Sequence, residues 1–105
     1  MDKYEGYYAS VTYACLLSLG FDIIAEDTTN HGRIDLTLFV DDKIYILEFK
    51  VTEQVKNKAT ALEQIKDRKY HEKYLSRSCD IYRIGMDFSR QKRNLIHFEW
   101  DVINH

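Results

Sequence analysis

The bulk properties of the chain are those of an ordinary globular protein. It has 105 residues, 45% hydrophobic and 30% charged, which fits one soluble domain over residues 1–105 with one core. The net charge is only −2, but residues 1–48 carry nine acidic and three basic side chains, and residues 49–105 carry eight acidic and twelve basic ones. This asymmetry suits a protein that holds metal in one region and a polyanion in another, although a mixed solvated surface gives the same pattern.

Cysteine usage argues against a zinc-binding protein, and hydropathy argues against a membrane-spanning one. Cys15 and Cys79 are the two cysteines, and without a CxxC pair or a Cys/His cluster a zinc site is not expected. We predict that both are buried free thiols in a reducing compartment. The early apolar run over residues 13–17 is too short to span a membrane. These features favour a cytoplasmic protein.

The hydrophobic pattern predicts helices and strands that alternate along the chain. The first helix has an apolar stripe that includes Tyr7, Val11 and Leu17, and Gly20 ends it. Because a helix separates two groups of strands, we expect an α/β fold with a mixed sheet and helices on both faces. The predicted elements are a helix over 3–19, a strand over 21–26, a polar loop over 27–32, strands over 32–40 and 43–51, a loop over 52–57, a helix over 58–77, and strands over 81–88 and 95–101.

Two of these strands are apolar yet carry three charged side chains. Asp35 lies on the first, and Glu48 and Lys50 lie on the second. Charges on a buried sheet are costly unless they are paired or bound to metal. If Asp41 and Asp42 form a two-residue turn, Asp35 faces Glu48 directly and Lys50 lies on the same face. We therefore expect the three charges to form one site, a prediction that a three-residue turn would break.

Two carboxylates and an amine at one strand end suit metal-assisted hydrolysis of phosphodiesters. Asp35 and Glu48 offer the hard oxygen ligands that Mg²⁺ prefers. The metal would lower the pKa of bound water and neutralise charge on the phosphate, and Lys50 would orient the water or stabilise the developing negative charge. The alternative is a cross-strand ion-pair network without catalytic function.

This constellation resembles the PD-(D/E)XK nuclease superfamily, whose fold is called restriction-endonuclease-like. The motif reads Ile34-Asp35, twelve intervening residues, then Glu48-Phe49-Lys50, with Ile34 in place of the family's proline. The chain looks like a small subfamily often found at the C-terminus of predicted bacterial AAA-type ATPases. This resemblance implies an αβββαβ core, here with an extra C-terminal strand, and a nucleic-acid substrate. Further segments that carry it are residues 5–8, 20–21, 25–27, 32–36, 46–51, 61–65 and 82–85.

The resemblance also implies a role for each residue of the motif. Asp35 and Glu48 would be metal ligands and Lys50 the catalytic lysine. The backbone carbonyl of Phe49 would complete the shell of a Mg²⁺ ion, for which Mn²⁺ would substitute. Glu5 matches a first-helix glutamate that many members direct at the metal; the alternative is a solvated glutamate favoured by the helix dipole.

Supporting residues are expected on the second helix and near the Asp35 strand. Gln64 matches a glutamine that some members place on this helix. Arg68 holds the place of a tyrosine often found four residues later, and Tyr70 follows it. Lys66 and Arg68 belong to the densest basic stretch and would contact phosphates, as would Arg33. The alternative is a solvated helix surface with ion pairs between neighbouring turns.

The first functional hypothesis is an enzyme, a Mg²⁺-dependent nuclease acting on DNA, with RNA as the alternative substrate. Cleavage would be structure-selective or nonspecific, since a chain of this length has little room to read bases. The second hypothesis is an inactive nuclease-fold module that binds or regulates an attached or partner ATPase. The third is an unrelated α/β interaction domain. Nucleases of this fold often act as dimers, so a homodimer is a further expectation, by analogy.

Overall fold

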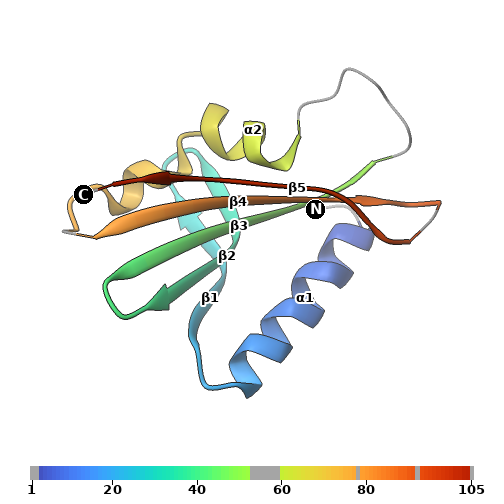
Figure 1. The fold of residues 1–105 in the computed structure, drawn as a ribbon, viewed down its shortest axis with the longest axis horizontal. Coiled ribbons are helices and arrows are strands. Elements are labelled where there is room, and N and C mark those ends of the chain that lie inside the picture. Colours follow the sequence, from blue (N-terminus) through green and yellow to red (C-terminus); the bar gives the residue numbers. More distant parts are fainter. Residues whose placement is uncertain (1–2, 53–59, 78, 92, 105) are drawn as a thin grey trace.

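A computed structural model describes residues 3–52, 60–77, 79–91 and 93–104. It contains a five-stranded sheet with helices on both faces (Figure 1). This architecture confirms the predicted α/β class, the αβββαβ order and the extra C-terminal strand. The elements are α1 (Lys3–Ser18), β1 (Asp22–Thr29), β2 (Gly32–Val40), β3 (Lys43–Thr52), α2 (Ala61–Asp67), a short 3₁₀ helix η1 (Tyr70–Tyr74), β4 (Asp80–Ser89) and β5 (Leu95–Ile103).

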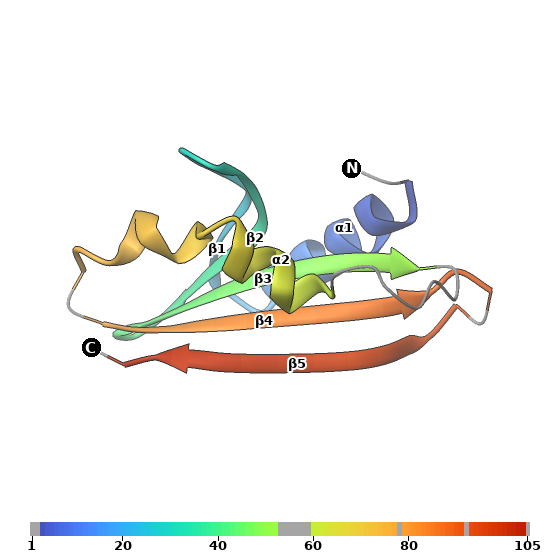
Figure 2. The same cartoon turned by 90° about the horizontal axis from the view of Figure 1, so that it is seen from above.

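The strands lie in the order β1-β2-β3-β4-β5, and each pair is antiparallel except β3 and β4, which are parallel. A parallel pair needs a crossover connection, which α2 and η1 provide above the sheet (Figure 2). The turn between β2 and β3 has two residues, as predicted. Val40 pairs with Lys43 and Leu36 with Leu47, the register that the sequence indicated.

Apolar side chains fill both sides of the sheet. Alternate residues of β3 point to opposite faces, so Ile44 and Ile46 face α2 while Leu47 and Phe49 face α1. Each helix is therefore held by its own cluster. The α2 side contains Ile34, Ile44, Ile46, Leu62, Ile65, Tyr70, Tyr74 and Ile81, and the α1 side contains Ala9, Ile23, Leu36, Leu47 and Phe49.

Strand β2 changes face at Asp35. Leu36 belongs to the α1-side cluster, whereas Ile34, two residues earlier, belongs to the α2-side cluster. Residues two apart normally share a face, so the strand rotates between them. Strand β1 also rotates at this level, because Glu26 has a positive φ of 52°. This rotation turns the start of β2 away from β3 and opens the sheet beside Asp35.

The predicted boundary of the first strand was wrong. Residues 27–29 continue β1 rather than forming a loop, and the connection to β2 shrinks to residues 30–31. Asp27 explains the difference, because it is only 3% exposed and its carboxylate accepts hydrogen bonds from Thr37, Lys73 and Tyr74. Partners distant in sequence thus stabilise a polar residue inside a strand.

The second helix is shorter than predicted. Helix α2 ends at Asp67, and Lys69 adopts a left-handed conformation with φ of 53° before η1 begins. A capping box between Thr60 and Glu63 fixes the start of α2. Residues 58–59 of the predicted helix and 53–57 of the predicted loop lie outside the described residues, and Thr52 ends β3.

Helix α1 has the predicted extent, and Gly20 follows it with φ of 89°, but its buried face differs from the prediction. Tyr7, Val11 and Leu17 are exposed, while Ala9 and its neighbours pack on the sheet. Apolar residues surround this helix on several sides, so their spacing alone does not single out the packed face.

The cysteine prediction is half right. Cys15 and Cys79 are both free thiols, but Cys15 is exposed on α1 and Cys79 is only partly buried. Neither of the helices in the described ranges has the length and apolar composition of a membrane span.

Gly85 on β4 allows α2 to lie directly against the sheet. A Cβ atom at this position would lie 2.3 Å from the backbone nitrogen of Leu62, so the backbone of α2 or β4 would have to move. We therefore expect Gly85→Ala to lower the free energy of unfolding by about 1–3 kcal/mol, as overpacking does. Urea denaturation measures the change. The exposed Ser10→Ala substitution serves as control, and equal stabilities of the two variants would contradict the prediction.

Candidate functional site

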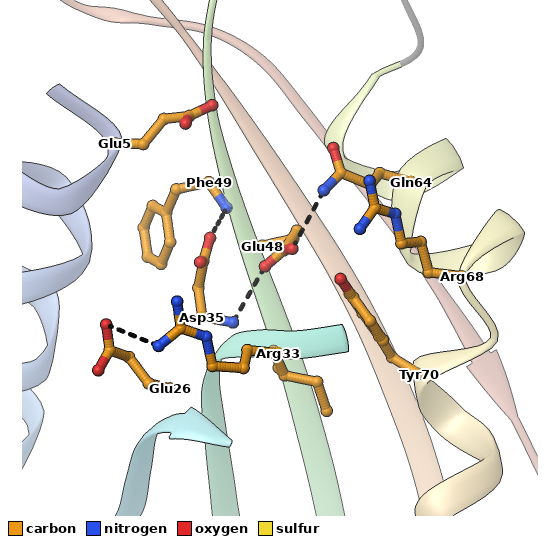
Figure 3. Close-up of a pocket in the computed structure, with 10 residues that line it drawn as sticks. Glu5, Glu26, Arg33, Asp35, Glu48, Phe49, Gln64, Arg68 and Tyr70 are labelled. Atoms are coloured by element: carbon orange, nitrogen blue, oxygen red, sulfur yellow. Dashed lines mark hydrogen bonds and ion pairs between the residues drawn. The ribbon is translucent and has the colours of Figure 1, made fainter. Parts of the chain in front are cut away.

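The site begins where β2 and β3 separate. Their backbone ladder runs to the Leu36–Leu47 pair, and beyond it two carboxylates act as hydrogen-bond acceptors. The amide of Phe49 donates to Asp35 Oδ2 at 2.8 Å, and the amide of Asp35 donates to Glu48 Oε2 at 3.1 Å (Figure 3). Each carboxylate therefore binds the backbone of the opposite strand and satisfies a buried amide that the ladder no longer pairs.

Burial makes this carboxylate pair electrostatically costly. Asp35 is 9% exposed and Glu48 is 4% exposed. Burial raises the pKa of Asp35, and it raises the pKa of Glu48 to about 10, with the negative charge of Asp35 adding to the shift at Glu48. Two like charges in a poorly solvated site do not ionise together readily, so the pair favours a bound proton or a bound cation.

The pair opens into a polar pocket of about 270 Å³. Residues from α1, the first three strands, α2 and η1 converge on it (Figure 3). The pocket thus depends on α1, α2 and η1 and not on the hairpin alone. Its lining residues are Glu5, Glu26, Arg33, Ile34, Asp35, Glu48, Phe49, Gln64, Arg68 and Tyr70.

Two side chains link the flanking helices to β3. Glu5 in the first turn of α1 accepts a hydrogen bond from the amide of Val51 at 3.3 Å, so it is tied to the sheet rather than merely solvated. Gln64 on α2 donates from Nε2 to Glu48 Oε1 at a long 3.5 Å. Both residues predicted as outer members of the site therefore reach it.

Basic and aromatic side chains also line the pocket. Arg33 lies 3.8 Å from Glu26, and both side chains are well exposed, so this ion pair is weak and open to exchange. Arg68 also lines the pocket. Tyr70 is buried, and burial, together with the nearby charge of Glu48, raises its pKa, so its hydroxyl stays protonated at neutral pH.

Comparison with known proteins identifies the family of this chain. A family model of the PD-(D/E)XK nuclease superfamily matches residues 3–98. The chain belongs to this superfamily. It is also 45% identical over 96 residues to a protein of Azotobacter chroococcum mcd 1 described as an uncharacterized protein in the vnfD 5′ region. The match covers 91% of this chain but 18% of that relative, so the chain spans about a fifth of the relative's length.

The donor set of the pocket fits the divalent metal ion on which PD-(D/E)XK nucleases generally depend. The two carboxylates nearest the centre are buried together, and the pKa values of both are raised. A cation between them would stabilise both ionised carboxylates, because it compensates both charges at once. Oxygen ligands of this kind match the preference of Mg²⁺ and Mn²⁺.

Two of the predicted basic residues lie apart from the pocket lining. Lys50 lies two residues beyond Glu48 on β3, half-buried, opposite Asp87 of β4 in the parallel register, and its catalytic role stays a prediction. Lys66 lies 3.3 Å from Asp101 of β5. The basic stretch is therefore partly engaged within the protein. Lys73 is similarly bound to Asp27, and positions 56 and 58 lie outside the described residues.

Two further features of the structure were not predicted. Glu26 lines the pocket because its left-handed conformation turns β1; it lies in a segment that carries the family resemblance, but no role in the site was predicted for it. Asp87, His97 and Glu99 gather on β4 and β5, with potential ligand atoms within 4.8 Å of one another. The only signal for this cluster was the alternation of His97 and Glu99 along one strand, which places them on the same face.

The raised carboxyl pKa values predict a pH dependence of stability in the metal-free protein. Glu48 keeps its proton in the folded state up to about pH 10 but loses it near 4.5 when unfolded, so rising pH between these values favours unfolding. We expect stability to fall by up to about 1.4 kcal/mol per pH unit from pH 5 to 8. Urea denaturation in chelator measures this slope. Glu48→Gln should flatten it, and equal slopes in both proteins would contradict the assignment.

Proposed function

We propose that this chain is a Mg²⁺-dependent nuclease domain that hydrolyses DNA phosphodiesters, with Mn²⁺ able to substitute. The observation that carries the proposal is the buried pair of Asp35 and Glu48, held by hydrogen bonds to the opposite strands. A carboxylate pair with raised pKa values in a polar pocket is a costly arrangement whose natural partner is a divalent cation. Membership of the PD-(D/E)XK superfamily supports the same reaction class.

Four groups would hold the metal ion. Asp35 and Glu48 would be its principal ligands, joined by the backbone carbonyl of Phe49 and by Glu5 from α1. A bound ion supplies a nucleophilic water at neutral pH and neutralises charge on the scissile phosphate. Gln64 would keep the Glu48 carboxylate in one orientation, since its amide points at Oε1 from α2.

The remaining residues would act on the nucleic acid. Arg33 and Arg68 would bind phosphates at the pocket mouth, and Tyr70 would donate a hydrogen bond from a hydroxyl that stays neutral. Lys50 would orient the attacking water or stabilise the developing negative charge. Recognition through phosphates carries no sequence information, so we propose structure-selective or nonspecific cleavage, with DNA favoured and RNA as the other arm of the test.

One observation favours a second function. The chain matches a segment that makes up 18% of a much longer relative, so domains of this type occur within larger proteins. An inactive nuclease-fold module serving an attached or partner ATPase would fit that setting. Catalytic activity and metal binding, measured together, separate the two functions.

The activity test uses single-stranded, duplex and branched DNA and RNA with Mg²⁺ or Mn²⁺. We expect Asp35→Asn, Glu48→Gln and Lys50→Ala each to lower the cleavage rate at least about 100-fold, since each removes a group acting on the developing charge. Lys66→Ala is the control, because its ammonium lies near Asp101 instead. Failure to cut any substrate, together with no thermal shift on adding Mg²⁺, would favour the binding module.

A binding test examines the two arginines. In an Asp35→Asn background that prevents cleavage, we expect Arg33→Gln and Arg68→Gln each to weaken DNA binding for all sequences alike. Each should reduce the slope of log K against log salt by about 0.9 on duplex DNA, the contribution of one phosphate contact. Fluorescence anisotropy over a salt series gives the slope. Lys66→Gln should leave it unchanged, and an unchanged slope in both arginine variants would remove them from the interface.

A further inference from the structure

A second cluster of potential ligands lies on the α2 face of the sheet, beyond Lys50. Asp87 of β4 pairs directly with His97 of β5, and Glu99 lies two residues further along β5, so all three share one face. Their ligand atoms lie within 4.8 Å of one another. The amide of Ala61 donates to Asp87 Oδ1 at 3.1 Å, which places the cluster beside the start of α2.

Two carboxylate oxygens of this cluster are buried without a hydrogen-bond partner among the described residues. Asp87 is 4% exposed, and its Oδ2 atom is one of them. Glu99 Oε1 is the other; it lies 2.8 Å from His97 Nε2, which is an ion pair only when the imidazole is protonated, and it accepts no hydrogen bond. A buried acceptor without a partner costs stability, and most native proteins avoid it.

An ordinary ion pair does not account for this arrangement. The His31–Glu72 pair elsewhere in the chain has a proper hydrogen bond at 3.0 Å, with both side chains about half exposed. At the cluster, a contact between His97 and Glu99 still leaves the buried Oδ2 of Asp87 without a partner. Lys50 on the adjacent strand contributes to the charge balance of Asp87 but does not hydrogen-bond this oxygen.

We propose that Asp87, His97 and Glu99 form a second cation site, selective for a first-row transition-metal ion such as Zn²⁺. Two carboxylate oxygens and one imidazole nitrogen match the preferences of these ions, whereas Mg²⁺ favours oxygen ligands alone. Three protein ligands leave further coordination positions for water. The side chains of His97 and Glu99 are 48% and 36% exposed, which gives an ion access from solvent.

Such an ion would connect three elements. Asp87 already contacts the first residue of α2, and His97 and Glu99 belong to β5, so binding would fasten the start of α2 to the β4–β5 hairpin. A ligand that binds only the folded state raises the unfolding temperature. The site would therefore act on stability rather than on the reacting phosphate, and it differs from the carboxylate pair in both place and donor chemistry.

Isothermal titration with Zn²⁺ tests the proposal in the Asp35→Asn/Glu48→Gln background, where the first site is disabled. We expect one Zn²⁺ to bind and to raise the unfolding temperature. His97→Gln and Glu99→Gln should each weaken binding at least about 10-fold. His31→Gln is the matched control, since it removes an equally exposed histidine beside a glutamate, and it should leave binding unchanged.

The imidazole ring of His97 gives a direct measure of Zn²⁺ binding. Zn²⁺ should shift the imidazole resonances of His97 in nuclear magnetic resonance spectra and leave those of His31 unchanged. No binding in the background variant, or binding that His97→Gln leaves intact, would overturn the proposal. Neither measurement depends on cleavage, so this result and the nuclease test succeed or fail independently.

Discussion

Asp35 and Glu48 each accept a hydrogen bond from the backbone of the opposite strand, and this pair of hydrogen bonds determines the shape of the site. Where β2 leaves β3, each carboxylate takes over one amide of the interrupted ladder. Hydrogen bonds to charged groups contribute about 1.5–3 kcal/mol each, but only while the acceptor keeps its charge. Burial of both carboxylates works against that charge. The same contacts that bridge the separating strands therefore leave a demand for positive charge at their junction.

The rest of the fold maintains that junction. Gly85 lets the backbone of α2 approach β4 closely, which brings Gln64 to within hydrogen-bond distance of Glu48. On the other face, Glu5 ties α1 to β3 just beyond the pair. The sheet supplies the two acids, and the helices fix their orientation from opposite sides. A pocket assembled this way depends on tertiary packing of both helices, not on the hairpin alone.

The hairpin could be predicted because its information is local. Alternation of apolar residues and a two-residue turn determine the register, and the register determines which side chains meet. The predictions from sequence fail where contacts between residues distant in sequence determine the local structure. Asp27 stays in β1 because Lys73 and Tyr74 reach it from η1, and Lys66 is directed to Asp101 on the last strand. Lys69, the left-handed residue that follows α2, likewise has no signal in composition or spacing.

The arrangement of charges follows from the parallel pair β3–β4. Glu48 and Lys50 lie in the second half of β3, and Asp87 lies near the end of β4 in register with Lys50. In open α/β sheets, ligands bind in the crevice outside the carboxyl ends of the strands. The proposed oxygen-only site on β2 and β3 and the proposed mixed oxygen–nitrogen site on β4 and β5 therefore lie near the same end of the parallel pair, with Lys50 two residues beyond Glu48 on β3 and opposite Asp87 of β4.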